Sequence, residues 1–185
     1  MPLEDSGAIR RVIRKLRPTI VVNTAAHTDP DRAEENGDLA MAINGAAPAI
    51  IADEVKRLGG GLVHFSTGCV FDGVKKTAYD EGDPPRPASV YGESRLAGEA
   101  GVRGVGVPHL IFRTNWIYGA RGSSFLRTTL DTAAAGKPLR AINDQRGAPT
   151  WCRMVAEATA LSVWPAKVAM ALMVVAVVVT GTAAA

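Results

Sequence analysis

Short apolar runs rich in branched residues recur along the chain, and the alternation of these runs with helical stretches constrains the fold most. The runs are Ile20-Val21-Val22, Leu62-Val63-His64-Phe65 and Leu110-Ile111-Phe112. Continuous apolar runs of this length are typical of parallel strands that are buried on both faces of a sheet. The sequence therefore predicts buried parallel strands near residues 20–23, 62–66 and 110–113.

The segments between these runs have the period of amphipathic helices. Before the first strand, apolar residues fall on one helical face and basic residues on the other, until Pro18 ends the pattern. Further helices are expected over residues 38–58, with a break between Asn44 and Pro48, and from Ser89 to about Val102. The order α-β-α-β-α-β favours an α/β fold built on a doubly wound parallel sheet with three α/β/α layers.

Charge and cysteine content argue against several classes of partner. The 21 basic and 18 acidic residues are interspersed, which indicates a mixed solvated surface and not a nucleic-acid-binding one. Cys69 and Cys152 form no spaced metal motif, so no metal is expected, and two reduced thiols are typical of a cytoplasmic protein. We interpret Cys69 as a small buried apolar residue, not as a reactive thiol.

The two ends of the chain give different signals. The first 15 residues lack an uninterrupted apolar core, so no secretory signal is expected there. Residues 168–185 carry no charge and could be non-native sequence from a frame change or gene fragment, a degenerate buried element or a membrane anchor. We favour the first interpretation and do not expect a membrane partner. The expected division is a partial nucleotide-binding domain over 1–163 and an apolar tail over 164–185.

The residues that follow the predicted strands are where a ligand of such a sheet would bind. Thr67 follows the second strand, and Tyr91 and Arg95 lie four residues apart, on one face of the next predicted helix. Taken alone, that spacing is common among surface residues. Together with Thr67 it suits carbonyl reduction, in which Thr67 polarises the carbonyl, Tyr91 donates the proton and a nearby cation lowers the pKa of the tyrosine.

Five runs of sequence resemble one known family, in the same order and from about Ser6 to Ala160. They are VVNTAAHT, LVHFST-x-x-VFDG, VYGESRLAGE, LIFRTNWIYGARG and INDQRGAPT. The chain resembles the extended short-chain dehydrogenase/reductase family, and within it the dTDP-4-dehydrorhamnose reductases. The resemblance implies a Rossmann-like fold, NADPH or NADH as cofactor and a nucleotide-sugar substrate. The implied reaction is reduction of the 4-keto group of dTDP-4-dehydro-L-rhamnose.

The resemblance also implies roles for individual catalytic residues. Thr67 and Tyr91 occupy two positions of the family's Thr-Tyr-Lys triad, and Arg95 stands where the lysine belongs. Guanidinium keeps the charge but has a higher pKa and a broader, planar shape than ammonium, so weakened catalysis is expected. The family has aspartate and tyrosine where this chain has Gly68 and Cys69, which puts substrate affinity in doubt.

Further binding residues are implied on the cofactor and substrate sides. Ala26, His27 and Thr28 match positions that line the cofactor, together with Tyr91 and Arg95. Substrate contacts are expected from Thr67, Gly68 and Trp116. A packed or hydrogen-bonded role for His27 and a plain buried role for Trp116 remain as alternatives. The loop from Asp144 to Thr150 matches closely but carries no assigned role.

One element of the family pattern is not found in the chain. Gly59-Gly60-Gly61 precedes a strand instead of following one, so it does not match the glycine-rich turn that holds a pyrophosphate. The resemblance therefore implies a fold that lacks its first β-α-β portion. A catalytically silent or fragmentary relative, which only binds a partner or a nucleotide sugar, is the alternative to an active reductase. A homodimer is left open.

Overall fold

The computed structural model describes residues 1–122, 124–140, 145–168 and 174–177. The chain forms two compact units, one made of Met1–Arg113 with Met170–Ala185 and the other of Thr114–Ala169. The sequence-based division at residue 163 stays a prediction. Within the described residues, no helix is both long and apolar enough to cross a membrane.

The first unit is built on a sheet with the strand order β3-β2-β1-β6. The strands are β1 (Ile20–Asn23), β2 (Gly61–Thr67), β3 (His109–Thr114) and β6 (Val174–Val177). The pair β1–β2 is parallel, with Ile20 opposite Gly61, and β1–β6 is parallel as well. The three predicted strands are thereby confirmed. The expectation that all three are buried is wrong for β3, because β3 lies at the edge of the sheet and Leu110 is 41% exposed.

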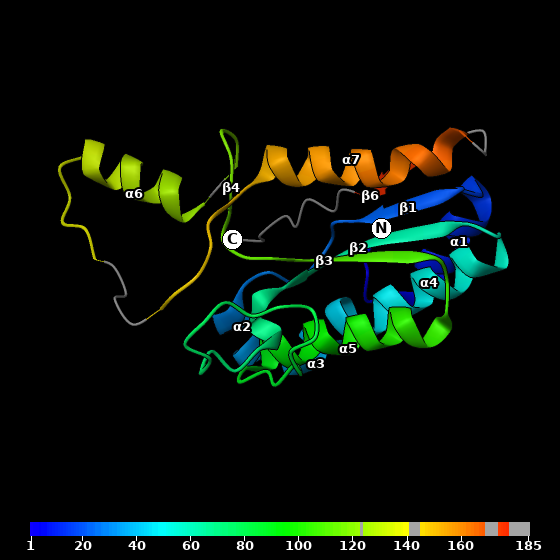
Figure 1. The fold of residues 1–185 in the computed structure, drawn as a ribbon, viewed down its shortest axis with the longest axis horizontal. Helices are drawn as coiled ribbons and strands as arrows, with labels where there is room; N and C mark the ends of the chain where they lie inside the picture. Colours follow the sequence, from blue (N-terminus) through cyan, green and yellow to red (C-terminus); the bar gives the residue numbers. More distant parts are fainter. Residues whose placement is uncertain (123, 141–144, 169–173, 178–185) are drawn as a thin grey trace. The chain divides into compact units, whose positions relative to one another are not determined.

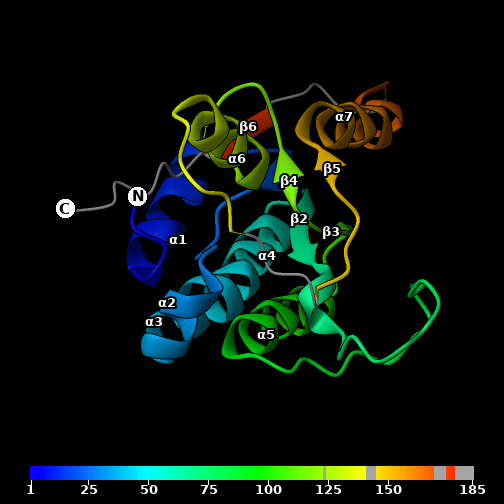
Figure 2. The ribbon, with the colours of Figure 1, turned by 90° about the vertical axis from the view of Figure 1, so that its left-hand side faces the viewer.

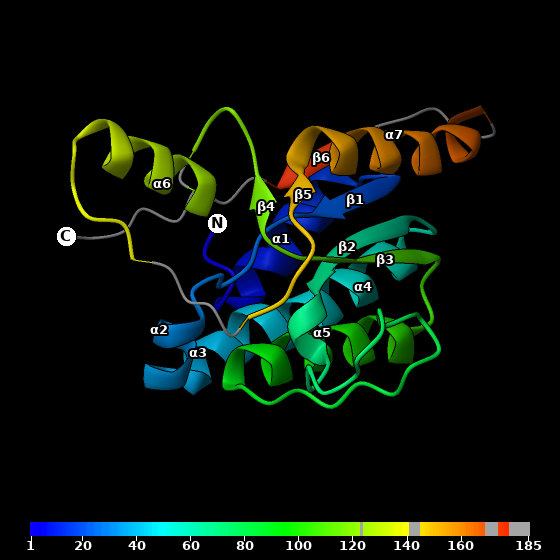
Figure 3. The ribbon, with the colours of Figure 1, turned by 60° about the vertical axis from the view of Figure 1, so that its left-hand side comes forward.

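Three helices cover one face of the strands β1, β2 and β3 (Figures 1 and 3). They are α1 (Ser6–Leu16), α4 (Ala47–Arg57) and α5 (Val90–Val105). Helix α1 begins where Asp5 accepts a hydrogen bond from the amide of Ala8, and it ends at Arg17 in the left-handed conformation. Its predicted apolar face is confirmed, because Ile9 and Ile13 are buried in the core of this unit. This apolar face therefore packs α1 against the core of the unit.

The predicted break in the second helical stretch is a π-helical turn. After β1 the chain forms α2 (Pro30–Glu35) and α3 (Gly37–Ala40), which the periodicity did not predict as separate helices (Figure 2). The π-helix η1 (Met41–Ala46) then leads directly into α4. Single π-turns inside helices occur often at functional sites.

A buried carboxylate joins α1 to α4. Glu54 on α4 accepts hydrogen bonds from Arg10 at 2.7 Å and from Arg14 at 2.6 and 2.7 Å. The hydrogen bond from Arg14 has the largest influence, and with Arg10 it overcomes the opposing effect of burial and lowers the pKa of Glu54 to about 2. Glu54 thus stays ionised in the folded protein at neutral pH.

The second unit contains two short strands and two helices. Strands β4 (Ile117–Tyr118) and β5 (Thr150–Trp151) pair in parallel, with Ile117 opposite Thr150. The helices are α6 (Phe125–Ala134) and α7 (Cys152–Val168). The apolar tail lies largely outside the described residues, which include only 174–177 beyond position 168. Its three interpretations therefore stay predictions.

We predict that Glu54→Gln destabilises the first unit in a pH-dependent manner. Because the folded-state pKa of Glu54 lies below its ordinary value, its ionised form contributes stability above about pH 4.5 that is lost as the pH falls toward 2. Chemical denaturation at neutral pH should show a loss of about 1–3 kcal/mol, with wild type and variant converging near pH 2.

Glu93→Gln is the matched control, because Glu93 is an exposed glutamate on α5. It should leave the free energy of unfolding unchanged at both pH values. A constant difference between wild type and Glu54→Gln across this range would contradict an electrostatic origin.

Candidate active site

The end of β2 places the predicted hydroxyl donor. Thr67 is the last residue of the strand and is buried, and its Oγ1 accepts a hydrogen bond of 3.2 Å from the amide of Cys69. The chain continues in a 3₁₀ turn, η2 (Gly68–Val70), which turns the next side chain outward. The prediction of a buried Cys69 is therefore wrong, because its side chain is exposed.

Tyr91 lies in the first turn of α5, directly beside this strand end. The helix is capped by Ser89, whose hydroxyl accepts from the amide of Gly92 at 3.1 Å. Tyr91 forms a hydrogen bond with Thr67. Burial raises the pKa of Tyr91, and the opposing effect of Arg95 does not cancel this increase. The phenol is therefore protonated at neutral pH.

A glycine allows α5 to approach the strand end this closely. A Cβ atom on Gly92 would lie 2.3 Å from the carbonyl oxygen of Cys69, which is backbone and cannot rotate away. Any side chain at position 92 would therefore push η2 away from the start of α5.

Arg95 lies one helical turn after Tyr91 and is only 4% exposed. Its Nη2 donates a hydrogen bond to the carbonyl oxygen of Phe65 in β2, while its Nε and Nη1 have no hydrogen-bond partner within the described part of the chain. Burial lowers the pKa of Arg95, and the neighbouring Tyr91 and Glu99 act in the opposite direction. Buried donors without a partner cost free energy, so they mark a place where a ligand could supply acceptors.

The loop after β1 is fixed by an asparagine that the sequence interpretation did not select. Asn44 in η1 accepts from the amide of His27 at 2.8 Å, and its Nδ2 donates to the His27 carbonyl and to Ser94 Oγ, both at 3.0 Å. One amide side chain thus ties the predicted cofactor loop to α5. Ala26 and His27 are half-buried and Thr28 is exposed. The only sign of a role for Asn44 in the sequence was the expected helix break between Asn44 and Pro48.

His64 is a second buried polar residue that sequence reasoning left inside an apolar run. It is fully buried in β2, and its Nδ1 lies 3.2 Å from Nδ2 of Asn23. Burial and, to a smaller extent, the charge of Arg95 lower the pKa of His64 to about 4. The imidazole is therefore neutral at physiological pH, and a charge change on His64 is not available near pH 7.

Trp116 belongs to the second unit. It adopts the left-handed conformation with φ of 44°, which is unusual for a residue with a large side chain, and it is 50% exposed. The alternative of a buried aromatic at this position is wrong. A Cβ on Gly147 would lie 2.9 Å from the Trp116 ring, so the loop at 147 packs closely on the indole. The first residue of that loop, Asp144, lies outside the described residues.

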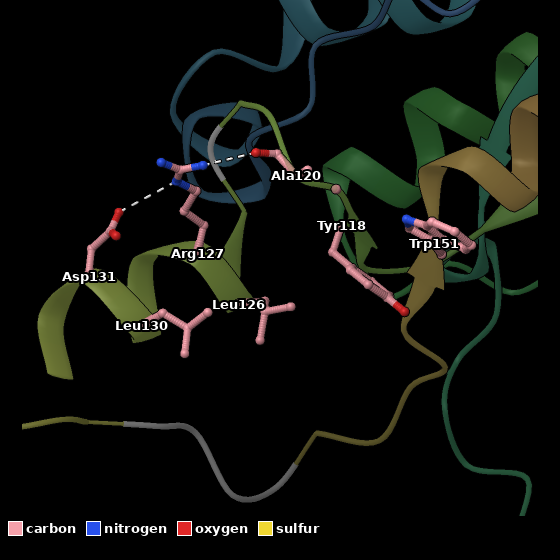
Figure 4. A pocket seen from close by; sticks show the side chains of 8 residues that line it. Tyr118, Ala120, Leu126, Arg127, Leu130, Asp131 and Trp151 are labelled. Atoms are coloured by element: carbon pink, nitrogen blue, oxygen red, sulfur yellow. Dashed lines mark hydrogen bonds and ion pairs between the residues drawn. The ribbon is translucent and has the colours of Figure 1, made fainter. Parts of the chain in front are cut away.

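The second unit also contains an open pocket of about 370 Å³. Tyr118 and Trp151, from the paired strands, and Leu126 and Leu130 of α6 line it (Figure 4). Arg127 of the same helix donates to the carbonyl of Ala120 at 2.9 Å. Sequence reasoning did not find this pocket, because Trp151 reaches the other lining residues only through the pairing of β4 with β5.

Comparison with protein families gives a match over almost the entire chain. The family model described as the RmlD substrate binding domain matches residues 1–172. The chain belongs to this family. The described parts of the chain contain no group of three or more His, Cys, Asp or Glu residues arranged to hold a metal ion.

Individual relatives and solved structures agree with this assignment. The chain is 45% identical over 152 residues to a dTDP-4-dehydrorhamnose reductase of Burkholderia thailandensis, covering 82% of this chain and 51% of that protein. The corresponding protein of Salmonella typhimurium is 41% identical, with the same shares covered. The chain thus spans about half the length of these relatives.

A crystal structure of the Bacillus anthracis dTDP-4-dehydrorhamnose reductase, in complex with NADP, has a TM-score of 0.85 and 29% identity. That match covers 98% of this chain and 63% of the other. The predicted α/β class with a Rossmann-like parallel sheet is confirmed by this likeness.

We predict opposite effects for two glycine-to-alanine changes in α5. A Cβ on Gly98 would lie 2.2 Å from the carbonyl oxygen of Asn44, whereas a Cβ on Gly104 meets nothing within 4 Å. Gly98→Ala should cost about 1–3 kcal/mol of stability, because the backbone of η1 must move. Gly104→Ala should stabilise the helix by about 0.5–1 kcal/mol.

Urea unfolding of the two variants measures both effects against wild type. Gly104→Ala serves as the control for the helix propensity that both changes share. Equal effects of the two substitutions would show that α5 and η1 are not in tight contact.

Proposed function

We propose that this chain carries the catalytic portion of an NAD(P)H-dependent reductase that acts on the 4-keto group of a dTDP-linked sugar, dTDP-4-dehydro-L-rhamnose. The observation that supports this most is the hydrogen bond between Thr67 and Tyr91, with the buried Arg95 one turn further along α5. Membership in the RmlD family and the reductases among the relatives support the same reaction.

In the proposed reaction, Thr67 and Tyr91 share the carbonyl oxygen of the sugar. Both hydroxyls can donate to that oxygen and polarise the carbonyl. Because burial raises its pKa, Tyr91 holds its proton at neutral pH and can transfer it to the oxygen as the alcohol forms. Arg95 stabilises the tyrosinate that remains, because its positive charge acts to lower the pKa of Tyr91.

The buried nitrogen atoms fit a nucleotide cofactor. Nδ1 of His27 and Nε and Nη1 of Arg95 are buried without partners among the described residues, and they suit the hydroxyl groups of a ribose. The cofactor, NADPH or NADH, supplies the hydride when bound. We assign Ala26, His27, Thr28 and Arg95 to its binding, and Gly68 and Trp116 to substrate binding, as part of this proposal.

The remaining expectations belong to the same proposal. A nucleotide sugar is the partner, a homodimer is the assembly to test by sedimentation, and the cytoplasm is the compartment. The free thiols of Cys69 and Cys152 support a reducing compartment.

A catalytically silent relative remains the second candidate, because the Arg95 guanidinium is held by the carbonyl of Phe65. An ammonium at the same position would be free to rotate and more compact. Binding of NADPH without any turnover, in the wild type and in Arg95→Lys alike, would favour this candidate.

The reductase proposal predicts a large effect for Tyr91→Phe. Two forms of the protein should be assayed with NADPH and dTDP-4-dehydro-L-rhamnose. One is the chain by itself, and the other is the chain joined to those segments of the Burkholderia thailandensis relative that it does not cover. Loss of a positioned general acid should lower kcat by about 10²–10⁴-fold, while Arg95→Lys should raise it by a smaller factor. The loss of NADPH absorbance measures both.

Glu93→Gln is the control on the same helix, since Glu93 is exposed and has no assigned role in the reaction, and it should leave kcat unchanged. Sugar-dependent turnover that survives Tyr91→Phe in full would show that Tyr91 is not the proton donor.

A further inference from the structure

A second buried carboxylate lies two turns below Tyr91 on the same helix. Glu99 is fully buried and accepts hydrogen bonds from Arg113 of β3, from Nε at 2.9 Å and from Nη2 at 2.7 Å. Arg103 contributes a third contact at 3.1 Å. Burial acts to raise the pKa of Glu99, but hydrogen bonds from Arg113 and Ser66 outweigh it, so the pKa is lowered. The pair fixes α5 to the edge strand.

Arg113 uses a different part of its guanidinium for a second contact. The edge of the group binds Glu99, while the carbon at its centre lies 4.9 Å from the centroid of the Phe71 ring. A planar guanidinium can bind a carboxylate with its edge and stack on an aromatic ring with its face, which an ammonium cannot do. Arg113 therefore connects α5 to the beginning of the loop between η2 and α5.

Tyr79 organises the start of that loop, and its ring stacks on the ring of Phe71. The rings of Phe71 and Tyr79 lie 4.3 Å apart and nearly parallel, at 10°. The Tyr79 hydroxyl donates to Asp72 at 2.6 Å and accepts from the amide of Lys75 at 3.1 Å. The amide of Val74 also donates to Asp72, at 3.2 Å. The hydrogen bonds at the start of the loop thus depend on the position of one tyrosine ring.

We propose that Arg113 is a positioning residue that holds the loop over residues 71–88 against α5 and so shapes the nucleotide-sugar side of the site. The loop begins four residues after Thr67 and ends immediately before Ser89, the cap of the helix that carries Tyr91. Its placement therefore bears on both hydroxyls of the candidate site. The loop's role toward the sugar rests on the proposed function, whereas its attachment through Arg113 does not.

Hydrogen exchange of the chain without ligand tests the attachment. Arg113→Lys keeps the charge but loses the bidentate contact and the stacking, so the amides of Val74 and Lys75 should exchange about tenfold faster. Arg103→Lys is the matched control, since Arg103 also pairs with Glu99 but has no ring contact in the described structure, and exchange should stay at the wild-type rate.

A second variant keeps the test decisive if Arg113→Lys disturbs the whole unit. Phe71→Leu leaves the Glu99–Arg113 pair intact and removes only the ring, so it should speed exchange in the loop without changing exchange in α5. Wild-type exchange of Val74 and Lys75 in both variants would overturn the proposal.

Kinetics separate the effect on the site from the effect on the loop. In the reductase assay, Arg113→Lys should raise KM for the nucleotide sugar about tenfold and change kcat less, and Arg103→Lys should do neither. Faster loop exchange with an unchanged KM would overturn the role in shaping the site. A chain without any reductase activity would contradict the proposed function alone, because the exchange experiment requires no substrate.

Discussion

The close contact between α5 and the π-turn η1 is the constraint on which the candidate site depends. Gly98 lets the two backbones approach to a distance that no side chain could occupy, and Asn44 then reaches Ser94 on α5. The same amide holds both backbone polar groups of His27. A π-turn exposes its backbone and side chains differently from an α-helical turn, which is how one asparagine can reach both elements. The loop after β1 and the helix of Tyr91 are therefore fixed by a single side chain.

Two buried glutamates hold helices of the first unit in place, each by binding two arginines. Glu54 on α4 binds two arginines of α1, and Glu99 on α5 binds Arg113 and Arg103. Each carboxylate is nearly inaccessible to solvent, whereas Arg10, Arg14 and Arg103 reach the surface and Arg113 is only 17% exposed. Such pairs contribute little net stability compared with an apolar contact, but leaving one partner unpaired is costly. They consequently favour one register of each helix over its alternatives.

The sequence predicted the elements of this fold better than the contacts between them. Strands β1 and β2 were predictable because branched apolar runs are local signals, and Tyr91 and Arg95 were placed together by helical spacing. The exposure of Cys69 was not predictable, since it depends on the 3₁₀ turn after Thr67. Asn44, Glu99 and Arg113 were missed for a related reason. Apart from the i,i+4 pair of Glu99 with Arg103, their partners lie 14 to 50 residues away, where no periodicity applies.

The outward position of Cys69 makes the site accessible to chemical labelling. Its amide is bound to the hydroxyl of Thr67, so the thiol is attached to the backbone that carries a proposed substrate contact. The other cysteine, Cys152, is also exposed but belongs to the second unit. A fluorescent maleimide on Cys69, in a chain with Cys152 replaced by serine, would therefore be a spectroscopic reporter at the rim of the proposed active site. Changes in its emission would follow events beside Thr67 without any substitution among the proposed catalytic residues.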